Sequence, residues 1–550
     1  MLNKNELPDN PDQLKDIIAQ LRDDYANLAS YTQDLEEMVI LLRRWRYAAS
    51  SEKQAHKQSR QPNLFDEVHP EAGSSEEPVC DHEAEPASEP ASTSCAGHAS
   101  GDKRGGKQPL PKALPREDIY TDIPEADKLC PCGQQRQRMG ESCCEKLAFL
   151  PARIWVRRYH RPKYACRSCE GTADETASAA VQAPLPPQVI PQGIATPELV
   201  ACVLTHKFVD SLPLYRQERM FARMGITLSR QTLSRWVIQA AEPAAPLLWA
   251  LDQDITAGDY IQMDETRVQV LGETDRSPQS PSYMWVLRGG RDPTRPLVRY
   301  HYDPSRSSEV ASRLLAGFEG YVQTDGYAGY NAVCQQSTIT RLGCWAHVRR
   351  KFMEVQKTRG KKHKSGMSDA VLKQISRLYH IEKQIRRQQL SAEQACAYRQ
   401  EQAQPVIDQI GQYLKDYADK VPPSSLLGKA VTYARHQWPQ LTVYLEDGRL
   451  HIDNNLVENA IRPFALGRKN WLFAGAVSGA HASAAWYSLT ESARANGLEP
   501  HSYLAFVLSQ VPCLNAQDAD ITAYQDLLPN RIDPATLQAY LAHKEASQAS

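Results

Sequence analysis

The sequence predicts a multi-domain α+β protein, and three observations support that prediction. Its 550 residues correspond to about three or four domains at roughly 150 residues each. Leucines recur at every seventh position near the start, which is typical of a coiled-coil helix. Farther along the chain, short runs of alternating apolar residues are separated by longer stretches with helical spacing, which is typical of a sheet combined with helices.

The composition excludes several classes of protein. The 64 basic and 65 acidic residues leave a net charge of −1, so a polyanionic partner must be bound by local basic patches. No apolar run approaches the roughly 18–20 residues that a bilayer span needs, and the polar amino terminus shows no signal segment. Thirteen cysteines are an odd number, so some thiols stay unpaired. We therefore expect a soluble cytoplasmic protein without a membrane partner.

Residues 1–49 are expected to form a leucine-zipper-like coiled coil. Two seams of apolar positions, four residues apart, repeat with a seven-residue step that keeps both facing a partner helix. The first seam is Leu14, Leu21, Leu28, Leu35 and Leu42, and the second is Ile18, Tyr25, Thr32 and Val39. A single amphipathic helix is the alternative, but it does not require so regular a step. We expect a homodimer joined through this helix.

Residues 50–115 are expected to be a disordered acidic and proline-rich linker. Hydrophobic periodicity disappears here, and residues 66–90 contain many acidic residues but no Lys or Arg. Such a segment cannot bury enough apolar surface to offset its ordering entropy. An acidic interaction segment is the alternative interpretation.

Residues 116–175 are expected to form a zinc-binding, β-rich module. Two close cysteine pairs, Cys130 with Cys132 and Cys166 with Cys169, flank a strand-rich segment and suit a tetrahedral thiolate site for structural Zn²⁺. The first pair is the tight C-x-C, so neighbouring cysteines are substitute ligands and incidental reduced thiols are the alternative. The stretch between the pairs is strongly basic. Phosphate contact by Arg157, Arg158, Arg161 and Lys163 is preferred over a merely solvated face.

Residues 190–250 are expected to form a helical, helix-turn-helix-like DNA-binding domain. The pattern predicts one helix, a turn at Gly225, and a second helix capped by Ser229. The second helix carries Arg230 and Arg235, which would enter a major groove. A simple helical hairpin without DNA contact is the alternative.

Three carboxylates stand in distinctive contexts. Asp264 lies inside an alternating strand, where an unpaired carboxylate is unfavourable unless it binds a metal or hydrogen-bond donors. Asp325 follows a short strand and precedes Gly326, and Glu458 lies in a helix after a predicted hairpin turn at Asp447 and Gly448. The alternative makes them a buried structural acid, a turn former and a solvated helix residue. Each alternative is reasonable alone, but all three together are less so.

Several segments resemble the insertion-sequence-66 family of transposases. They are MDETRVQVL (263–271), YVQTDGYAGYN (321–331), GCWAHVRRKF (343–352), the run that starts DNNLVENAIRPF (453–464), and the cysteine-rich segment. The resemblance implies a ribonuclease-H-like α/β catalytic core, here residues 255–510, whose Asp, Asp and Glu fall on Asp264, Asp325 and Glu458. Family members usually show C-x-x-C where this chain has Cys130 and Cys132, which affects the zinc geometry and not the core.

The chemistry of that family explains the need for carboxylates. DNA cleavage and strand transfer are in-line displacements at phosphorus, which two Mg²⁺ ions about 4 Å apart can assist. Mg²⁺ prefers oxygen ligands, and Mn²⁺ is an acceptable substitute. We expect Asp264 to bridge both ions, with Asp325 and Glu458 each completing one site.

Basic residues surround these acids in the sequence. We expect DNA contacts from two groups, Arg349, Arg350 and Lys351 after the second acid and Arg462, Arg468 and Lys469 after the third. His347 would orient water or a phosphate, although a structural histidine is the more common case. For Trp345 and Trp471 core packing is preferred over base stacking. The spacing from about 366 to 440 predicts a helical insertion, and residues 511–550 form a tail of weak helical character.

These observations predict a nucleoid-associated DNA transposase that cuts and joins strands at the inverted ends of a mobile element. Its partners would be double-stranded DNA, a second copy of the chain and accessory transposition proteins. Two alternatives stay open: a non-catalytic DNA-binding regulator, and a metal-dependent nuclease that does not join strands.

Overall fold

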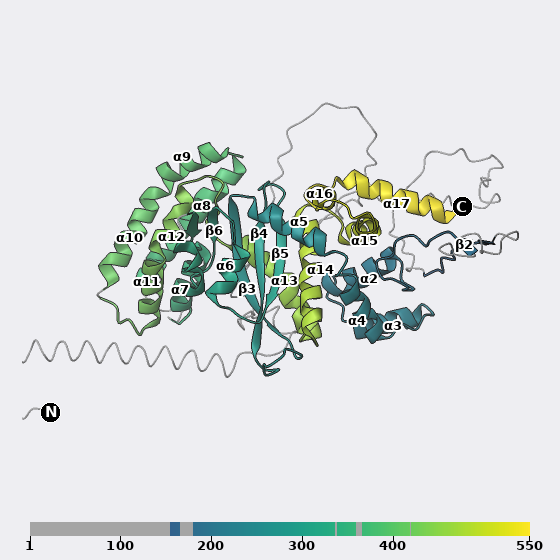
Figure 1. Ribbon diagram of the computed structural model, residues 1–550. Coiled ribbons are helices and arrows are strands. Elements are labelled where there is room, and N and C mark those ends of the chain that lie inside the picture. The colour runs from purple at the N-terminus through teal and green to yellow at the C-terminus, as the bar shows by residue number, and fades with distance from the viewer. Residues whose placement is uncertain (1–153, 166–179, 336–337, 359–365, 419, 550) are drawn as a thin grey trace, which may run out of the picture. The chain divides into compact units, whose positions relative to one another are not determined.

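The computed structural model describes residues 154–165, 180–335, 338–358, 366–418 and 420–549 (Figure 1). The chain divides into two compact units, residues 76–160 and the remainder, and each is described by itself. The expected coiled coil and linker lie outside the described residues, as do Cys130, Cys132, Cys166 and Cys169.

A five-stranded mixed sheet forms the centre of the larger unit. Its strands are β3 (Tyr260–Gln269), β4 (Pro281–Gly289), β5 (Leu297–Asp303), β6 (Gly320–Gln323) and β7 (Ile339–Leu342), in the order β5-β4-β3-β6-β7. The first three strands pair antiparallel, whereas β6 and β7 run parallel to β3. The strands predicted from alternating apolar residues are therefore confirmed.

Helices pack on this sheet through small and aromatic side chains. Helix α14 (Val477–Ala495) lies along β5, and α13 (Asn455–Trp471) contacts β3 and β4. The alanines and serines of α14 allow this close approach, because Ser488 and Ser492 bond directly to the backbone of β5. The helix ends at Ala495, with Asn496 as the C-cap and Gly497 following at a φ of 71°.

The helices before the sheet include the expected helix pair. They are α2 (Pro197–Phe208), α3 (Leu214–Arg223), α4 (Arg230–Gln239) and α5 (Ala245–Thr256). Gly225 has a φ of 87°, and the Ser229 hydroxyl accepts a hydrogen bond from the Thr232 amide, so the predicted turn and cap are confirmed. These helices also pack on α14 and α15, and Trp486 Nε1 donates to Val237 O at 2.8 Å. Their core is thus continuous with that of the carboxyl-terminal helices.

A group of helices separates β7 from α13 and gathers beside the sheet (Figure 1). They are α7 (Trp345–Thr358), α8 (Met367–Arg387), α9 (Ala392–Gln402), α10 (Gln404–Ala418), α11 (Leu426–His436), α12 (Trp438–Thr442) and η4 (Val443–Leu445). Their apolar faces share one core, which includes Trp345, Phe352, Ile375 and Ile410. The helical spacing predicted for 366–440 is confirmed.

The predicted hairpin around Asp447 and Gly448 is wrong. The apolar run before it forms α12 and η4, and the residues after it form turns. The Arg399 guanidinium donates to the carbonyls of Tyr444, Asp447 and Leu450, each at 2.8 Å. Because a buried side chain satisfies these carbonyls, the segment needs no strand partner.

The remaining elements are short or lie near the carboxyl terminus. Helix α15 runs through residue 510 and packs against α2, so it crosses the expected boundary between core and tail. None of the described helices is long and apolar enough to cross a membrane. The short elements and those near the carboxyl terminus are β1 (Lys163–Ala165), β2 (Ala180–Gln182), α6 (Ser308–Leu314), η2 (Ala328–Tyr330), η3 (Val333–Gln335), α15 (Pro500–Ala516), α16 (Ile521–Gln525) and α17 (Pro534–Ala549).

Candidate active site

Asp264 lies on β3, and Asp325 follows the neighbouring parallel strand β6 by two residues. The register pairs Gln262 of β3 with Gln323 of β6, and each aspartate follows its glutamine by two residues. Since side chains alternate along a strand, the Asp264 carboxylate points to the face on which Gln262 lies. The Tyr327 amide donates to Asp325 Oδ1 at 2.9 Å, which holds this carboxylate at the carboxyl edge of the sheet.

Two buried glutamines connect these strands to the helix that carries Glu458. Gln262 Nε2 donates to Gln323 Oε1 at 2.7 Å and to the Asp453 carbonyl at 3.1 Å. Gln262 Oε1 accepts from the Val457 amide at 3.2 Å, one residue before Glu458. Both glutamines are fully buried. The first turn of α13 is therefore fixed against the strands by side-chain hydrogen bonds that span nearly 200 positions of sequence.

The charges of the three acids interact. Desolvation raises the pKa of Asp264 well above its ordinary value, and the charges of Glu265, Asp325 and Glu458 raise it further. Burial raises the pKa of Glu458 to about 8; Arg350 opposes this rise, while Asp453 and Asp325 add to it. Groups influence one another in this way only when they lie close together. The three predicted carboxylates therefore interact electrostatically, although the group of three possible metal-ligand atoms that lie within 4.8 Å of one another among the described residues belongs to Cys344, His347 and Glu458.

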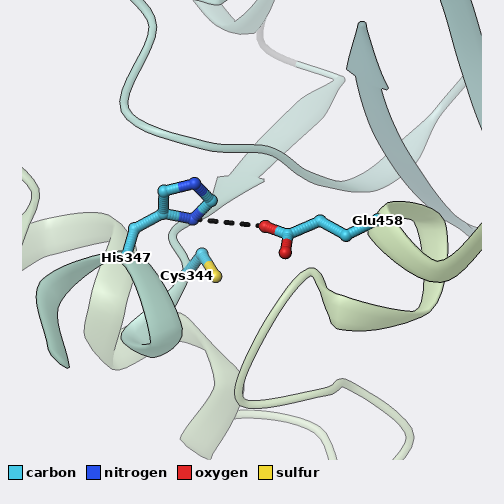
Figure 2. Close-up of side chains that lie close together, drawn as sticks. All are labelled: Cys344, His347 and Glu458. Atoms are coloured by element: carbon cyan, nitrogen blue, oxygen red, sulfur yellow. Dashed lines mark ion pairs between the residues drawn. The ribbon is translucent and has the colours of Figure 1, made fainter. Parts of the chain in front are cut away.

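Glu458 has no hydrogen-bond partner for either carboxylate oxygen among the described residues, although the side chain is 1% exposed. Figure 2 shows His347 and Cys344 beside it. His347 Nδ1 lies 3.6 Å from Oε1, and Arg350 Nη2 lies 3.8 Å from Oε2. Both separations are too long for hydrogen bonds. Burial, together with Arg350 and Lys351, lowers the pKa of His347 to about 3, so this imidazole is neutral.

Cys344, His347 and Glu458 each offer one possible metal-ligand atom, and these atoms lie within 4.8 Å of one another. Burial raises the pKa of the Cys344 thiol well above its usual range, so in this structure it is a neutral thiol. Its Sγ accepts a hydrogen bond from the Asn454 amide at 3.3 Å, at the start of α13. Because the thiolate is the metal-binding form, we assign Cys344 to positioning α13.

Two acids beside the cluster were not singled out in the sequence. Glu265 accepts hydrogen bonds from the Tyr330 hydroxyl and the Arg306 guanidinium, and Asp453 accepts one from the Tyr379 hydroxyl at 2.8 Å. Both carboxylates therefore have partners within the protein. Glu265 lies on the opposite face of β3 from Asp264, because side chains alternate along a strand. The sequence pattern therefore did not indicate that Glu265 lies near the predicted acids.

The two tryptophans near the site differ in their surroundings. Trp345 is fully buried and donates to the Leu441 carbonyl at 2.9 Å, which confirms core packing. Trp471 is half-buried and packs against Phe464, with ring centroids 5.4 Å apart.

The predicted DNA-binding residues of the core fall at two distances from the acids. Arg350 lies beside Glu458, whereas Arg349 is half-buried and Lys351 exposed on α7. Arg462 follows Glu458 by one turn of α13. Arg468 and Lys469 belong to the far end of that helix, about 15 Å along its axis.

The basic residues before the core are partly exposed. Arg230 and Arg235 are exposed on α4, where no described partner engages their guanidinium groups. Arg158 and Lys163 are exposed, and Arg157 is half-buried. Arg161 Nη1 donates to the Ala183 carbonyl at 3.0 Å.

Four family models match the chain in succession. Residues 192–482 match "Transposase IS66 family" and 488–529 match "IS66 C-terminal element". Residues 127–170, which contain the two cysteine pairs, match "zinc-finger binding domain of transposase IS66", and this match supports a structural zinc. Residues 34–119 match "Transposase C of IS166 homeodomain".

Relatives of similar length occur in Sinorhizobium fredii. The uncharacterized protein y4jD is 36% identical over 412 residues, covering 73% of this chain and 78% of that protein. The uncharacterized protein y4hP is 31% identical, covering 77% and 76%. Among solved structures, the Drosophila P element transposase strand transfer complex aligns at 10% identity with a TM-score of 0.29, over 56% of this chain and 94% of that one. A likeness this small supports no inference.

Proposed function

The chain belongs to the IS66 family of transposases, and we propose that this DNA transposase cuts and joins strands with Asp264, Asp325 and Glu458. One observation carries the proposal: three acids from separate segments interact, because Asp325 and Glu458 raise the pKa of Asp264, and Asp325 raises that of Glu458. Such crowding is unfavourable unless a cation or a substrate compensates for it, and it is typical of catalytic sites.

The donor atoms fit divalent metal ions. Both oxygens of Glu458 are buried without a partner among the described residues, and they belong to the hard oxygen ligands that Mg²⁺ and Mn²⁺ accept. Asp264, Asp325 and Glu458 would hold two Mg²⁺ ions. When bound, such ions neutralise charge on the phosphodiester and lower the pKa of water.

The neighbouring side chains position the acids and the DNA. Gln262 fixes the first turn of α13, and with it Glu458, against β3 and β6. Arg350 places a positive charge where a phosphate would approach Glu458, and neutral His347 can accept or donate a hydrogen bond there. Arg349, Lys351 and Arg462 would bind the flanking backbone phosphates.

The strand order supports a ribonuclease-H-like core for residues 255–510. Three antiparallel strands followed by two parallel ones place the first strand at the centre, where it carries Asp264. We extend the proposal to the other regions. Residues 1–49 would join two protomers, Cys130, Cys132, Cys166 and Cys169 would bind zinc, and α4 would contact the element ends through Arg230 and Arg235. The proposal also includes accessory transposition proteins as partners and association with the nucleoid.

The test uses purified protein, Mg²⁺ and a duplex that carries one end of the element. We expect Asp264→Asn and Glu458→Gln to abolish cleavage while DNA binding persists, and Glu354→Gln, an exposed acid on α7, to cleave normally. Unchanged cleavage by either site variant would overturn the assignment. Binding without cleavage by the wild type would favour a regulator. Cut ends that never join target DNA would favour a nuclease.

A further inference from the structure

Helix α13 ends in an unusual turn at Leu472. This residue has a φ of 66° and a ψ of −54°, and the Phe473 amide donates to the Trp471 carbonyl at 2.9 Å. A hydrogen bond across three residues with these angles defines a γ-turn of the strained, positive-φ type. A bulky residue such as leucine rarely adopts it.

The surrounding backbone imposes this strain. The Leu472 amide donates to the Arg468 carbonyl at 2.7 Å on one side of the turn. On the other side, Ala474 forms a bridge with Val270 and bonds to the Gln269 carbonyl at 2.9 Å. The chain must therefore reverse within a few residues between α13 and the end of β3. Strain that is over-determined in this manner is concentrated at functional sites.

The turn presents apolar side chains to solvent. Leu472 is 63% exposed and Phe473 is 43% exposed, directly after Trp471, which packs on Phe464. Burial in the core therefore does not explain why leucine occupies a position that glycine would adopt without strain.

A basic groove lies beside the turn. It has a volume of about 350 Å³, and its walls include Arg267 of β3, Arg468 of α13 and Leu472, without any acidic residue. Neither guanidinium makes a hydrogen bond or an ion pair with the described residues. Burial lowers the pKa of Arg468, which indicates a charge that is partly desolvated and uncompensated. The chemistry of this groove matches a phosphate group.

The groove is close enough to the acidic cluster to share one duplex with it. Arg267 follows Asp264 by three residues on β3, an advance of about 10 Å, and its side chain lies on the opposite face of the strand. Arg468 follows Glu458 by ten residues on α13, about 15 Å. Both distances are shorter than one turn of DNA, about 34 Å.

We propose that Arg267 and Arg468 hold a DNA phosphate in this groove while Leu472 and Phe473 insert between neighbouring bases and kink the duplex. The inference rests on the proposed function only for its partner, DNA. Apolar wedges flanked by arginines unstack a base step in this manner and bend DNA by about 20–90°. The kink would open the duplex near the site of strand cleavage.

The test measures binding and bending without chemistry. Full-length protein is titrated, without divalent metal, into a random-sequence 40-base-pair duplex carrying a fluorescent donor and acceptor at its ends. Wild-type protein should bring the dyes closer. Leu472→Gly should lose the bend and bind at least roughly fivefold more weakly, the equivalent of one lost stacking contact. Its thermal midpoint should be unchanged or raised, because glycine relieves the strain.

Phe473→Ala should weaken bending as well, whereas Trp249→Ala, a matched exposed aromatic on α5, should change nothing. Arg267→Ala should lower the slope of log affinity against log salt by about one phosphate contact. Wild-type bending by Leu472→Gly would overturn the inference, as would a change in oligomeric mass with DNA binding unaltered. Because no cleavage is measured, neither result depends on the roles of the three acids.

Discussion

Two buried glutamates of this protein, each near an arginine, have opposite surroundings. Glu382 on α8 is 4% exposed, and both its oxygens accept hydrogen bonds from Arg399, at 2.8 and 2.9 Å. Glu458 on α13 is 1% exposed, yet its nearest cation, Arg350, stays 3.8 Å away, and neither oxygen has a partner among the described residues.

The difference separates a structural ion pair from a buried carboxyl group that lacks hydrogen bonds. A buried carboxylate is tolerated when hydrogen bonds replace its lost water, as they do for Glu382. Glu458 lacks that compensation, although Arg350 is within reach of a small side-chain movement. The folded chain therefore retains a buried carboxyl group without hydrogen bonds at a place where a cation would be stabilised.

The largest expected effect concerns Glu458, whose carboxylate oxygens have no hydrogen bonds. Glu458→Gln should lower transposition of a marked element in cells by about 10⁴-fold, because the metal ligand and its charge are lost. The free energy of unfolding should not fall, since the variant replaces a buried carboxyl group whose oxygens have no hydrogen-bond partner among the described residues. Circular dichroism and denaturant titration measure the second quantity. Normal transposition by Glu458→Gln would show that Glu458, like Glu382, has no role in the reaction.

Breaking the ion pair between Glu382 and Arg399 should lower stability. Arg399→Met should lower the free energy of unfolding by about 3–5 kcal/mol, because it leaves Glu382 buried without a partner. The double variant Glu382→Leu with Arg399→Met should recover part of that loss, since no charge then remains. Loss of transposition in the single variant should track loss of soluble folded protein. Full stability of Arg399→Met would show that the pair is not structural.

Metal addition should have a smaller effect, which is a rise in stability that depends on Glu458. Mg²⁺ at about 100 times its dissociation constant should raise the free energy of unfolding by about 2.7 kcal/mol, because only the folded state assembles the site. Differential scanning calorimetry should show this rise for the wild type and for Glu354→Gln, but not for Glu458→Gln. Equal protection of all three proteins would place the metal elsewhere.

The smallest expected effect is a change in pH dependence. The folded pKa of Glu458 is raised to about 8 from an ordinary 4.5. Its stabilising contribution is therefore complete below about pH 4.5 and is lost as the pH rises through 8. Glu458→Gln should show a shallower decline in stability over this interval. A residual decline should remain, because Asp264 is shifted in the same direction. If the wild type and Glu458→Gln had the same pH dependence of stability, the raised pKa of Glu458 would be contradicted.

Periodic features of the fold were predictable from the sequence, whereas contacts between distant side chains were not. Alternation predicted the strand that carries Asp264, and helical spacing with a cap predicted α4. Helical spacing also predicted helices over 366–440, but not that Glu382 is buried, which is possible because Arg399 is available from α9. No local pattern signals a partner seventeen positions away on another helix.

The candidate site shows the same limit. The contexts of Asp264, Asp325 and Glu458 marked them as candidates, but the glutamine pair that aligns them was not recognised. Gln262 and Gln323 lie 61 positions apart, and their interaction follows from strand register, which the sequence alone did not provide. The hairpin prediction failed for a related reason, since Arg399 satisfies carbonyls that a strand would otherwise pair.

The Arg399 contacts also hold the segment that leads to the third acid. Arg399 holds the carbonyls of Tyr444, Asp447 and Leu450, and the Tyr379 hydroxyl holds Asp453, immediately before α13 begins. Glu458 follows both aspartates in the chain, and these contacts tie the segment before it to helices α8 and α9. A chain that stopped before α13 would carry the two aspartates without the third carboxylate.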